Sequence, residues 1–198
     1  MVDESNVHVK VAMADVLGLL VVSMFTFAVA AFGLGANGDF SLLNLIVAIG
    51  PAVGIATLIA AVFCYVNENL LGTAIFGPLA VFFLTVVTLG LTDAGLSSAA
   101  VLCMVIGIII LIDAIVAFAQ PVKLLPILLI VAAIAFFVTG LWYDAMQSIH
   151  GNGNDYRMMV GALWMIYSLI SFYMAAAIML LVMKGKPVLP LLIMTKKA

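Results

Sequence analysis

Six long apolar segments dominate this sequence, and each is long enough to cross a lipid bilayer. A spanning helix needs about 20 consecutive apolar residues, and charges and Gly, Pro and Asn clusters divide the chain into segments of about that length. Because 67% of the residues are hydrophobic and only 8% are charged, no segment suits a soluble domain. The sequence therefore predicts an all-α integral membrane protein, a bundle of six transmembrane helices. The predicted spans are 15–36, 42–66, 73–92, 98–119, 124–146 and 157–184.

The segments between the spans are short, so consecutive helices should be neighbours in one bundle. We expect a transmembrane domain over 15–184 with an N-terminal tail (1–14) and a C-terminal tail (185–198). With six spans both tails lie on one side, and that side would carry six lysines against Arg157 on the other. This asymmetry predicts a multi-pass protein of the cell (plasma or inner) membrane with cytoplasmic termini. The lysines are Lys10, Lys123, Lys184, Lys186, Lys196 and Lys197.

The composition also argues against several classes of function. The few charges are scattered, which does not favour a nucleic-acid partner. Cys64 and Cys103 lie in apolar context without CxxC or metal-like spacing. No segment resembles a hydrolase triad, a metal cluster, a phosphate-binding loop or a haem ligand pair. We therefore expect no enzyme activity, no metal and no cofactor, with the lipid bilayer as the main surroundings.

One acidic residue interrupts the fourth span, where Gly107–Phe118 reads GIIILIDAIVAF. A charge at the centre of a bilayer costs roughly 3 kcal/mol or more, so Asp113 should face the bundle interior and be protonated, or share a proton, at neutral pH. Three roles stay open: a proton carrier, a docking point for a cation or hydrogen-bonding solute, and a neutral hydrogen bond between helices. No basic residue lies in a span core, which favours a hydroxyl or amide partner. Candidate partners are Thr85, Thr88 and Thr139.

Aromatic residues cluster in the third and sixth spans. Such residues are typical of lipid-facing packing and of interfacial belts, and we expect most of them to serve there. The residues are Phe76, Phe82, Phe83, Trp164, Tyr167, Phe172 and Tyr173.

The stretch ENLLGTAIFGPLAVFFLT (68–85) resembles the ENTFG signature of the acetate uptake transporter family, the succinate-acetate permeases. Glu68, Asn69 and Gly72 match its opening. Two further stretches stand in the family's order: LGLLVVSMFT (17–26), which begins next to Gly18 and is similar to LGLMGFGMTT, and KPVLPLL (186–192), which is similar to RTVLP. The resemblance implies structural roles in the family motifs for Gly18, Glu68, Asn69 and Gly72.

The resemblance implies a six-helix bundle with a narrow pore in each protomer and assembly into a hexamer. The implied activity is that of a membrane channel or proton-linked transporter (a symporter) for acetate and related small carboxylates such as succinate. A pore without Lys or Arg in its walls must use dipoles or carry the acid in neutral form.

The sequence departs from the family at the pore itself. The family's NPAPLG motif is here MADVLG (13–18), its first-helix constriction Phe falls at Val22, and its third-helix constriction Tyr falls at Leu79. We expect Val22, Phe25, Phe76 and Leu79 to line the pathway and its constriction. Asp113 has no counterpart in the family, so its role as a proton-coupling residue or polar pore contact rests on physical grounds alone.

Two other readings remain open. A urea or short-amide channel has a similar six-helix, pore-per-protomer architecture, and a wall of dipoles plus one acid suits a neutral hydrogen-bonding solute. A non-transporting subunit of a larger membrane complex would use its apolar faces to dock a partner and Asp113 to hold helices together.

Overall fold

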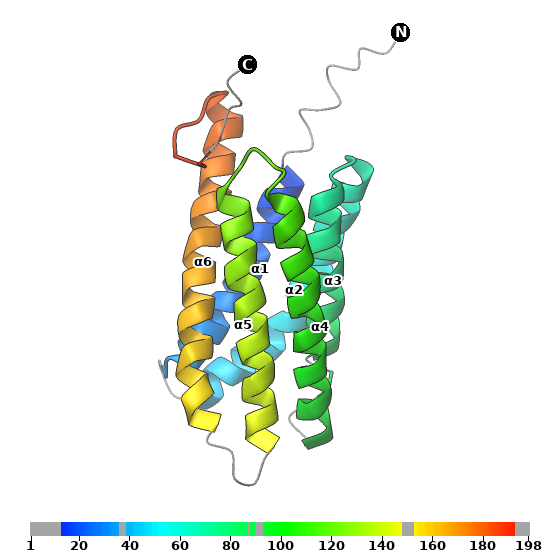
Figure 1. The fold of residues 1–198 in the computed structure, drawn as a ribbon, viewed down its shortest axis with the longest axis vertical. Helices are drawn as coiled ribbons and strands as arrows, with labels where there is room; N and C mark the ends of the chain where they lie inside the picture. The colour runs from blue at the N-terminus through cyan, green and yellow to red at the C-terminus, as the bar shows by residue number, and fades with distance from the viewer. Residues whose placement is uncertain (1–12, 36–38, 87, 90–92, 148–152, 193–198) are drawn as a thin grey trace.

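A computed structural model of the chain describes residues 13–35, 39–86, 88–89, 93–147 and 153–192. All regular elements in these ranges are helices, which confirms the all-α class and the six-helix bundle (Figure 1). Lys10, Lys196 and Lys197 and most of the predicted N-terminal tail lie outside the described residues. The helices are α1 (Met13–Gly33), α2 (Asp39–Val66), α3 (Leu70–Val86), α4 (Asp93–Ala117), α5 (Leu124–Gln147) and α6 (Gly153–Lys184).

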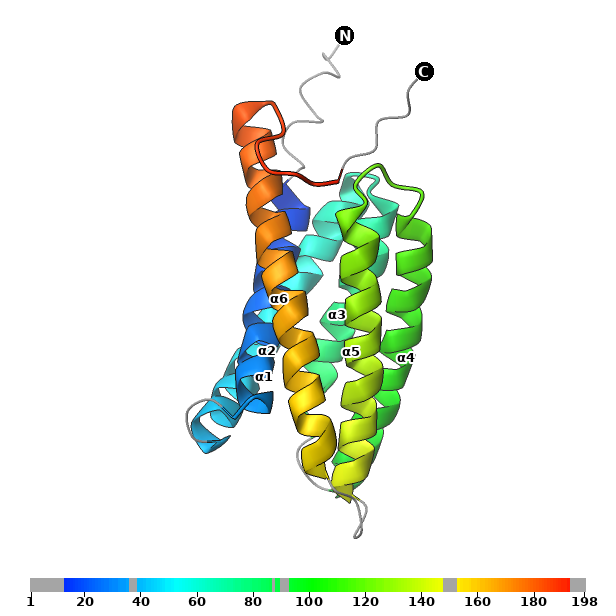
Figure 2. The ribbon, with the colours of Figure 1, turned by 60° about the vertical axis from the view of Figure 1, so that its left-hand side comes forward.

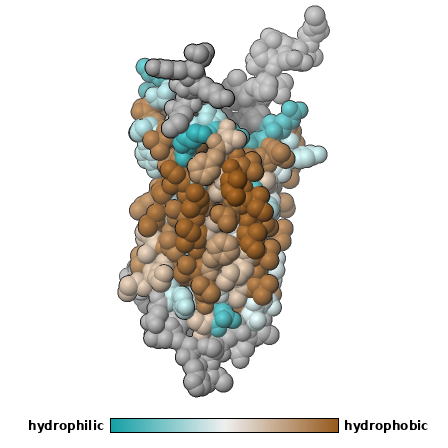
Figure 3. Space-filling model, in the orientation of Figure 1, coloured by the Kyte–Doolittle hydropathy of each residue, from teal (hydrophilic) through white to brown (hydrophobic). Residues whose placement is uncertain are grey.

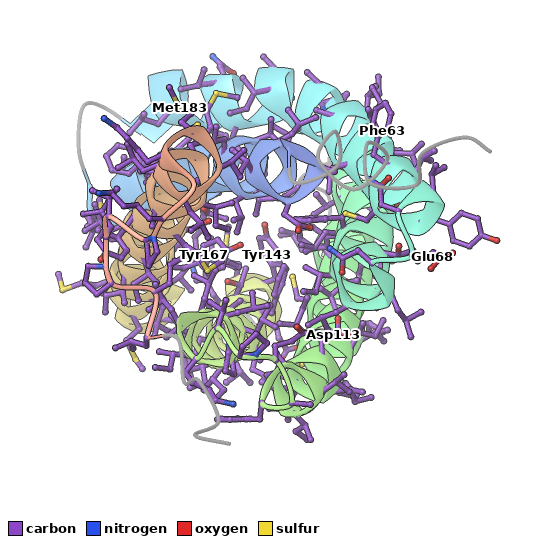
Figure 4. The ribbon with its side chains drawn as sticks, turned by 90° about the horizontal axis from the view of Figure 1, so that it is seen from above. Phe63, Glu68, Asp113, Tyr143, Tyr167 and Met183 are labelled. Atoms are coloured by element: carbon purple, nitrogen blue, oxygen red, sulfur yellow. The ribbon has the colours of Figure 1, made fainter. Side chains whose placement is uncertain are left out.

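The six helices form a closed ring. Each helix packs against the helices before and after it in the chain, and α6 packs against α1 (Figures 1 and 2). This order follows from the short connections, which leave consecutive helices little choice of neighbour. Seen from above, the helices surround a common centre (Figure 4).

The dimensions and surface of the ring suit a bilayer. Five helices are long and apolar enough to cross a membrane, whereas α3 has only 17 residues. At 1.5 Å per residue α3 extends about 26 Å, slightly less than the roughly 30 Å of a hydrocarbon core. The space-filling view shows a hydrophobic band around the middle with hydrophilic residues near both ends (Figure 3).

The limits of α3 differ from the predicted span of 73–92. The helix begins at Leu70 because the Asn69 side-chain oxygen accepts the backbone N–H of Gly72 at 3.0 Å, which is the N-cap arrangement. It ends at Val86, and the Thr88 amide and hydroxyl then both donate to the Thr85 carbonyl, at 3.0 Å and 2.7 Å. These local bonds form a turn where the apolar pattern alone suggested more helix.

Two glycines set the crossing of α1 and α6. A Cβ atom on Gly161 would lie 2.7 Å from the Leu34 backbone nitrogen and 2.8 Å from the Gly33 carbonyl carbon. Since real Cβ atoms do not approach so closely, only glycine permits this contact between backbones. Beside it, Arg157 donates to the Phe32 carbonyl at 2.8 Å and closes the last turn of α1. The ring is thus joined tightly at its first and last helices.

The first part of the predicted C-terminal tail packs on the bundle. After α6, Gly185 adopts a left-handed φ of 63°, and the chain turns back across the end of the ring (Figure 2). Tyr173 donates its hydroxyl to the Pro190 carbonyl at 2.9 Å, Leu191 is buried, and the Lys123 amide donates to Leu192 at 3.3 Å. We call this end, where Lys123 and Lys184 lie, the lysine end.

Candidate functional site

A cavity of about 170 Å³ lies at the centre of the ring. Residues from all six helices contribute to its wall, so it depends on the complete bundle. The described residues that line it are Val22, Phe25, Thr26, Val29, Phe32, Leu43, Ile46, Val47, Ile75, Leu79, Phe82, Phe83, Val86, Ile110, Leu129, Ala132, Phe136, Thr139, Trp142, Tyr143, Met146, Trp164 and Tyr167.

The cavity occupies one half of the bundle. Phe32, Val86 and Met146 line it and lie at the ends of α1, α3 and α5, opposite the lysine end. Among the described lining residues only Val47 and Met146 are exposed, each at 46%, and we call these two residues the rim. The cavity therefore lies toward the end of the bundle opposite the lysine end.

A belt of aromatic rings runs across the wall from α1 through α3 and α5 to α6. Its neighbouring rings meet edge to face, with centroid distances between 4.8 Å and 5.5 Å. Edge-to-face pairs at this distance attract one another beyond simple burial, so the belt is a firm apolar surface. In order, its members are Phe25, Phe83, Phe82, Phe136 and Trp164.

Three polar side chains of the wall, Thr26, Thr139 and Trp164, are hydrogen-bonded within the protein. The Thr26 hydroxyl lies 2.8 Å from that of Ser168 and 2.9 Å from the Val22 carbonyl. The Thr139 hydroxyl donates to the Ala135 carbonyl at 2.7 Å and accepts the indole N–H of Trp164 at 3.0 Å. These bonds leave little capacity for a solute.

The Tyr143 hydroxyl and the Trp142 indole N–H differ from these groups, because neither makes a hydrogen bond within the part of the chain that the structure describes. The Tyr143 ring stacks on that of Trp142 at 5.5 Å. Tyr143 and Tyr167 lie at the centre of the ring of helices (Figure 4). None of the described lining residues carries a charge. The site can therefore offer a solute hydrogen bonds and apolar contact, but no ion pair.

The predicted pathway residues fall in two places. Val22, Phe25 and Leu79 line the cavity together. Phe76 does not line it, because its ring packs over Gly18 in the space that a side chain there would fill. Gly18 and Phe76 thus hold α1 against α3 on the lysine side of the cavity.

A hydrogen-bonded cluster closes the lysine end of these helices. The Asn69 side-chain amide donates to both carboxylate oxygens of Asp15 at 3.0 Å, and the Cys64 thiol donates to Asp15 at 3.3 Å. A Cβ on Gly72 would lie 2.8 Å from atoms of all three side chains. Glu68 is exposed in the preceding turn, with φ 57° (Figure 4). Two of the motif residues, Asn69 and Gly72, therefore meet at the join between α1, α2 and α3.

Asp113 is 6% exposed, and its Oδ2 atom is buried without a hydrogen-bond partner among the described residues. It follows Ile110 by one turn of α4, and Ile110 lines the cavity whereas Asp113 does not. The expected threonine partners bond elsewhere: Thr139 with Ala135 and Trp164, and Thr88 with Thr85. No hydroxyl of Thr85, Thr88 or Thr139 is seen to bond to Asp113 in the described residues, so of the two expectations a protonated carboxyl group stays a prediction, and Asp113 does not line this cavity.

The sequence reading missed the role of α6. Trp164 and Tyr167, assigned there to lipid packing and interfacial belts, are 4% and 5% exposed and line the cavity. A signal was present, because Ser168 and Ser171 continue the same helix face at spacings of three and four residues. Both serines are fully buried, so this polar stripe marks the inner face of the helix.

Comparison with solved structures identifies a protein of the same fold. The bacterial acetate channel SatP matches with a TM-score of 0.76 and 24% sequence identity, covering 89% of this chain and 97% of that chain. No protein-family model matches the chain, and no curated protein sequence does. The likeness confirms, at the level of the fold, the resemblance found in the sequence. This chain has the six-helix fold of a membrane channel.

Proposed function

We propose that this protein is a membrane channel or proton-linked transporter for acetate and related small carboxylates, and a member of the acetate uptake transporter family. The observation that carries the proposal is the central cavity, lined from all six helices of a fold shared with an acetate channel. The motif residues Asn69 and Gly72 support it, because they secure the join between α1, α2 and α3 at the lysine end.

The chemistry of the wall favours a neutral acid. A carboxylate ion in an apolar cavity without a cation pays a large desolvation cost, whereas the protonated acid needs only hydrogen bonds. Each acid molecule that crosses in this form brings one proton with it. Transport through such a wall is therefore linked to the proton gradient even without a separate proton site.

Asp113 is our candidate for a proton-coupling residue. Its carboxyl group is buried one turn beyond the cavity wall, between the cavity and the lysine end, and Oδ2 has no partner in the described chain. Ionisable residues inside a membrane domain are costly and commonly serve proton or ion pathways. We propose that Asp113 takes part in proton passage across the half of the bundle where the cavity ends.

The proposed setting is the cell (plasma or inner) membrane, with the lysine end in the cytoplasm and homohexameric assembly as the family resemblance implies. In this orientation the rim of the cavity faces outward. The exposed apolar faces of α2 and α4 would then contact lipid or neighbouring protomers; they include Ile55, Ile59, Val62, Val105, Ile112 and Ile115.

Uptake of labelled acetate into proteoliposomes tests the proposal. We expect uptake driven by an inward proton gradient in the native chain and its collapse to the level of empty liposomes in Asp113→Asn. The matched control is Asp144→Asn, because Asp144 is exposed near the end of α5, and it should keep native uptake. Unchanged uptake in Asp113→Asn would make Asp113 structural, and no acetate uptake in the native chain would refute the proposed function.

The same wall suits a neutral hydrogen-bonding solute, which keeps a urea or short-amide channel as the alternative. The specific observation in its favour is the absence of charge among the described lining residues. Labelled urea in the same liposomes separates the two, since only acetate uptake should respond to the proton gradient.

A further inference from the structure

We infer that the cavity is built for a monocarboxylic acid with a longer apolar tail than acetate, of the size of hexanoic acid. Its tail lies against the aromatic belt, and its carboxyl group bonds to the Tyr143 hydroxyl near the rim. This inference rests on the proposed function in taking a carboxylic acid as the solute, and it concerns which acid the site prefers.

The size of the cavity carries the first step. Its volume is about 170 Å³, and an apolar cavity of about 150 Å³ in another protein takes up benzene. Acetic acid is much smaller than benzene and would leave most of this wall without contact. Wall atoms that face empty space make no dispersion contacts and bury no apolar surface of the ligand. A larger apolar group therefore binds more tightly.

The residues that line the inner part of the cavity are apolar, which is the second observation in favour of a longer tail. Phe25, Phe82 and Phe136 belong to the aromatic belt and line the cavity, and Val22 and Leu79 line it too. All five are buried. An aliphatic chain is the chemical group that such a surface binds best, since it brings no polar atom that would need a partner.

Tyr143 lies near the rim of the cavity, which is the third observation and indicates where the carboxyl group binds. The hydroxyls of Thr26 and Thr139 and the indole of Trp164 are bonded within the protein, whereas the Tyr143 hydroxyl has no partner in the described chain. Tyr143 precedes the rim residue Met146 by one turn of α5. A carboxyl group placed there stays close to water while its tail reaches the dry interior.

Intrinsic fluorescence of the purified full chain gives a direct test. The protein has 2 tryptophans, and both Trp142 and Trp164 line the cavity. We expect hexanoate to change their emission at a concentration at least about tenfold lower than acetate, because each added methylene is buried. Hexan-1-ol, which has the same tail without the carboxyl group, controls for partition into detergent.

Two pairs of variants locate the binding. Leu79→Phe fills the cavity and should abolish the hexanoate response, whereas Met24→Phe, at a site 49% exposed outside the cavity, should keep it. Tyr143→Phe should weaken hexanoate by about tenfold, the loss of one hydrogen bond, and leave hexan-1-ol unchanged. Tyr65→Phe, at a position 76% exposed, is its control. If Leu79→Phe does not fold, Val22→Phe fills the same cavity from α1.

The outcomes separate this inference from the proposed function. Equal responses to acetate and hexanoate, or a hexanoate response that survives both filling variants, would overturn the inference while acetate uptake in liposomes still supported transport. A Tyr143→Phe variant with native hexanoate affinity would overturn the carboxyl contact. Saturable hexanoate binding without acetate uptake would uphold the inference and refute acetate as the solute.

Discussion

Asn69 serves two helices at once. Its side-chain oxygen caps α3 through the Gly72 amide, and its side-chain nitrogen donates to both oxygens of Asp15 in α1. The two roles use different atoms of one amide group, so substitutions can remove them separately. Serine keeps an acceptor for the cap but has no donor that reaches two carboxylate oxygens in this way.

We therefore expect Asn69→Ala to lower the free energy of unfolding by about 2–3 kcal/mol, because it removes the cap and leaves Asp15 under-bonded. Asn69→Ser should cost about 1 kcal/mol less, since it retains the cap. Thermal unfolding of the purified protein in detergent measures both. Equal losses in the two variants would mean that the cap contributes nothing.

At the scale of single residues, part of the site could be predicted from the sequence. The motif resemblance singled out Asn69 and Gly72, and the departure at Val22 and Leu79 pointed to residues that do line the cavity. Asp15 was missed, because its partner Asn69 is 54 positions away and no local pattern announces the pair. Phe76 was misplaced for a related reason: which face of α3 meets Gly18 depends on how α1 packs.

Among the helices, the crossing of α1 and α6 depends on glycine, whereas the helical Gly77 has open space around it. A Cβ on Gly161 would collide with the backbone of Gly33 and Leu34, and a Cβ on Gly77 would meet nothing within 4 Å. Both positions lie inside helices; they differ in their surroundings and in that Gly77 directly precedes Pro78.

Gly161→Ala should destabilise the protein by about 2 kcal/mol, because the two helices must move apart. Gly77→Ala should be neutral or stabilising by up to about 1 kcal/mol, as alanine is the better helix former. Unfolding temperatures in the same detergent check the pair. A Gly161→Ala variant as stable as Gly77→Ala would contradict the close crossing.

The existence and order of the helices could be predicted from apolar length alone, because the bilayer demands spans of about that length. Their ends could not. The limits of α3 follow from a cap at Asn69 and a turn at Thr85 and Thr88, and such bonds are weaker signals than hydrophobicity. The face of α6 that points into the ring was not predicted, because apolar residues also occupy the other faces of this helix.

For the whole molecule, the cavity lies toward one end and the Asp15 cluster lies at the other. Met146 stands at the rim, whereas the native thiols Cys64 and Cys103 are 1% and 0% exposed. If the lysine end lies in the cytoplasm, as the lysine asymmetry predicts, the rim faces outward. The side of the membrane from which a thiol reagent reacts therefore reports the orientation of the protein. The lack of reaction at Cys64 and Cys103 reports that the native thiols are buried.

We expect Met146→Cys to react with a membrane-impermeant thiol reagent added to the outside of intact cells, and the native chain not to react. Gel-shift labelling with a maleimide reagent measures this. Labelling of Met146→Cys only after the membrane is opened would show that the rim faces the cytoplasm and would contradict the predicted orientation.

The closed ring also bears on how the protein is made. A chain that enters the membrane from its N-terminus can pack each new helix on the one just inserted, since neighbours in the ring are neighbours in sequence. The contact between Gly33 and Gly161 forms only when α6 arrives. Because α6 supplies Trp164 and Tyr167 to the wall, an unfinished chain has no complete cavity. In a nascent copy on the ribosome, the cavity is therefore complete only after the last helix is in place.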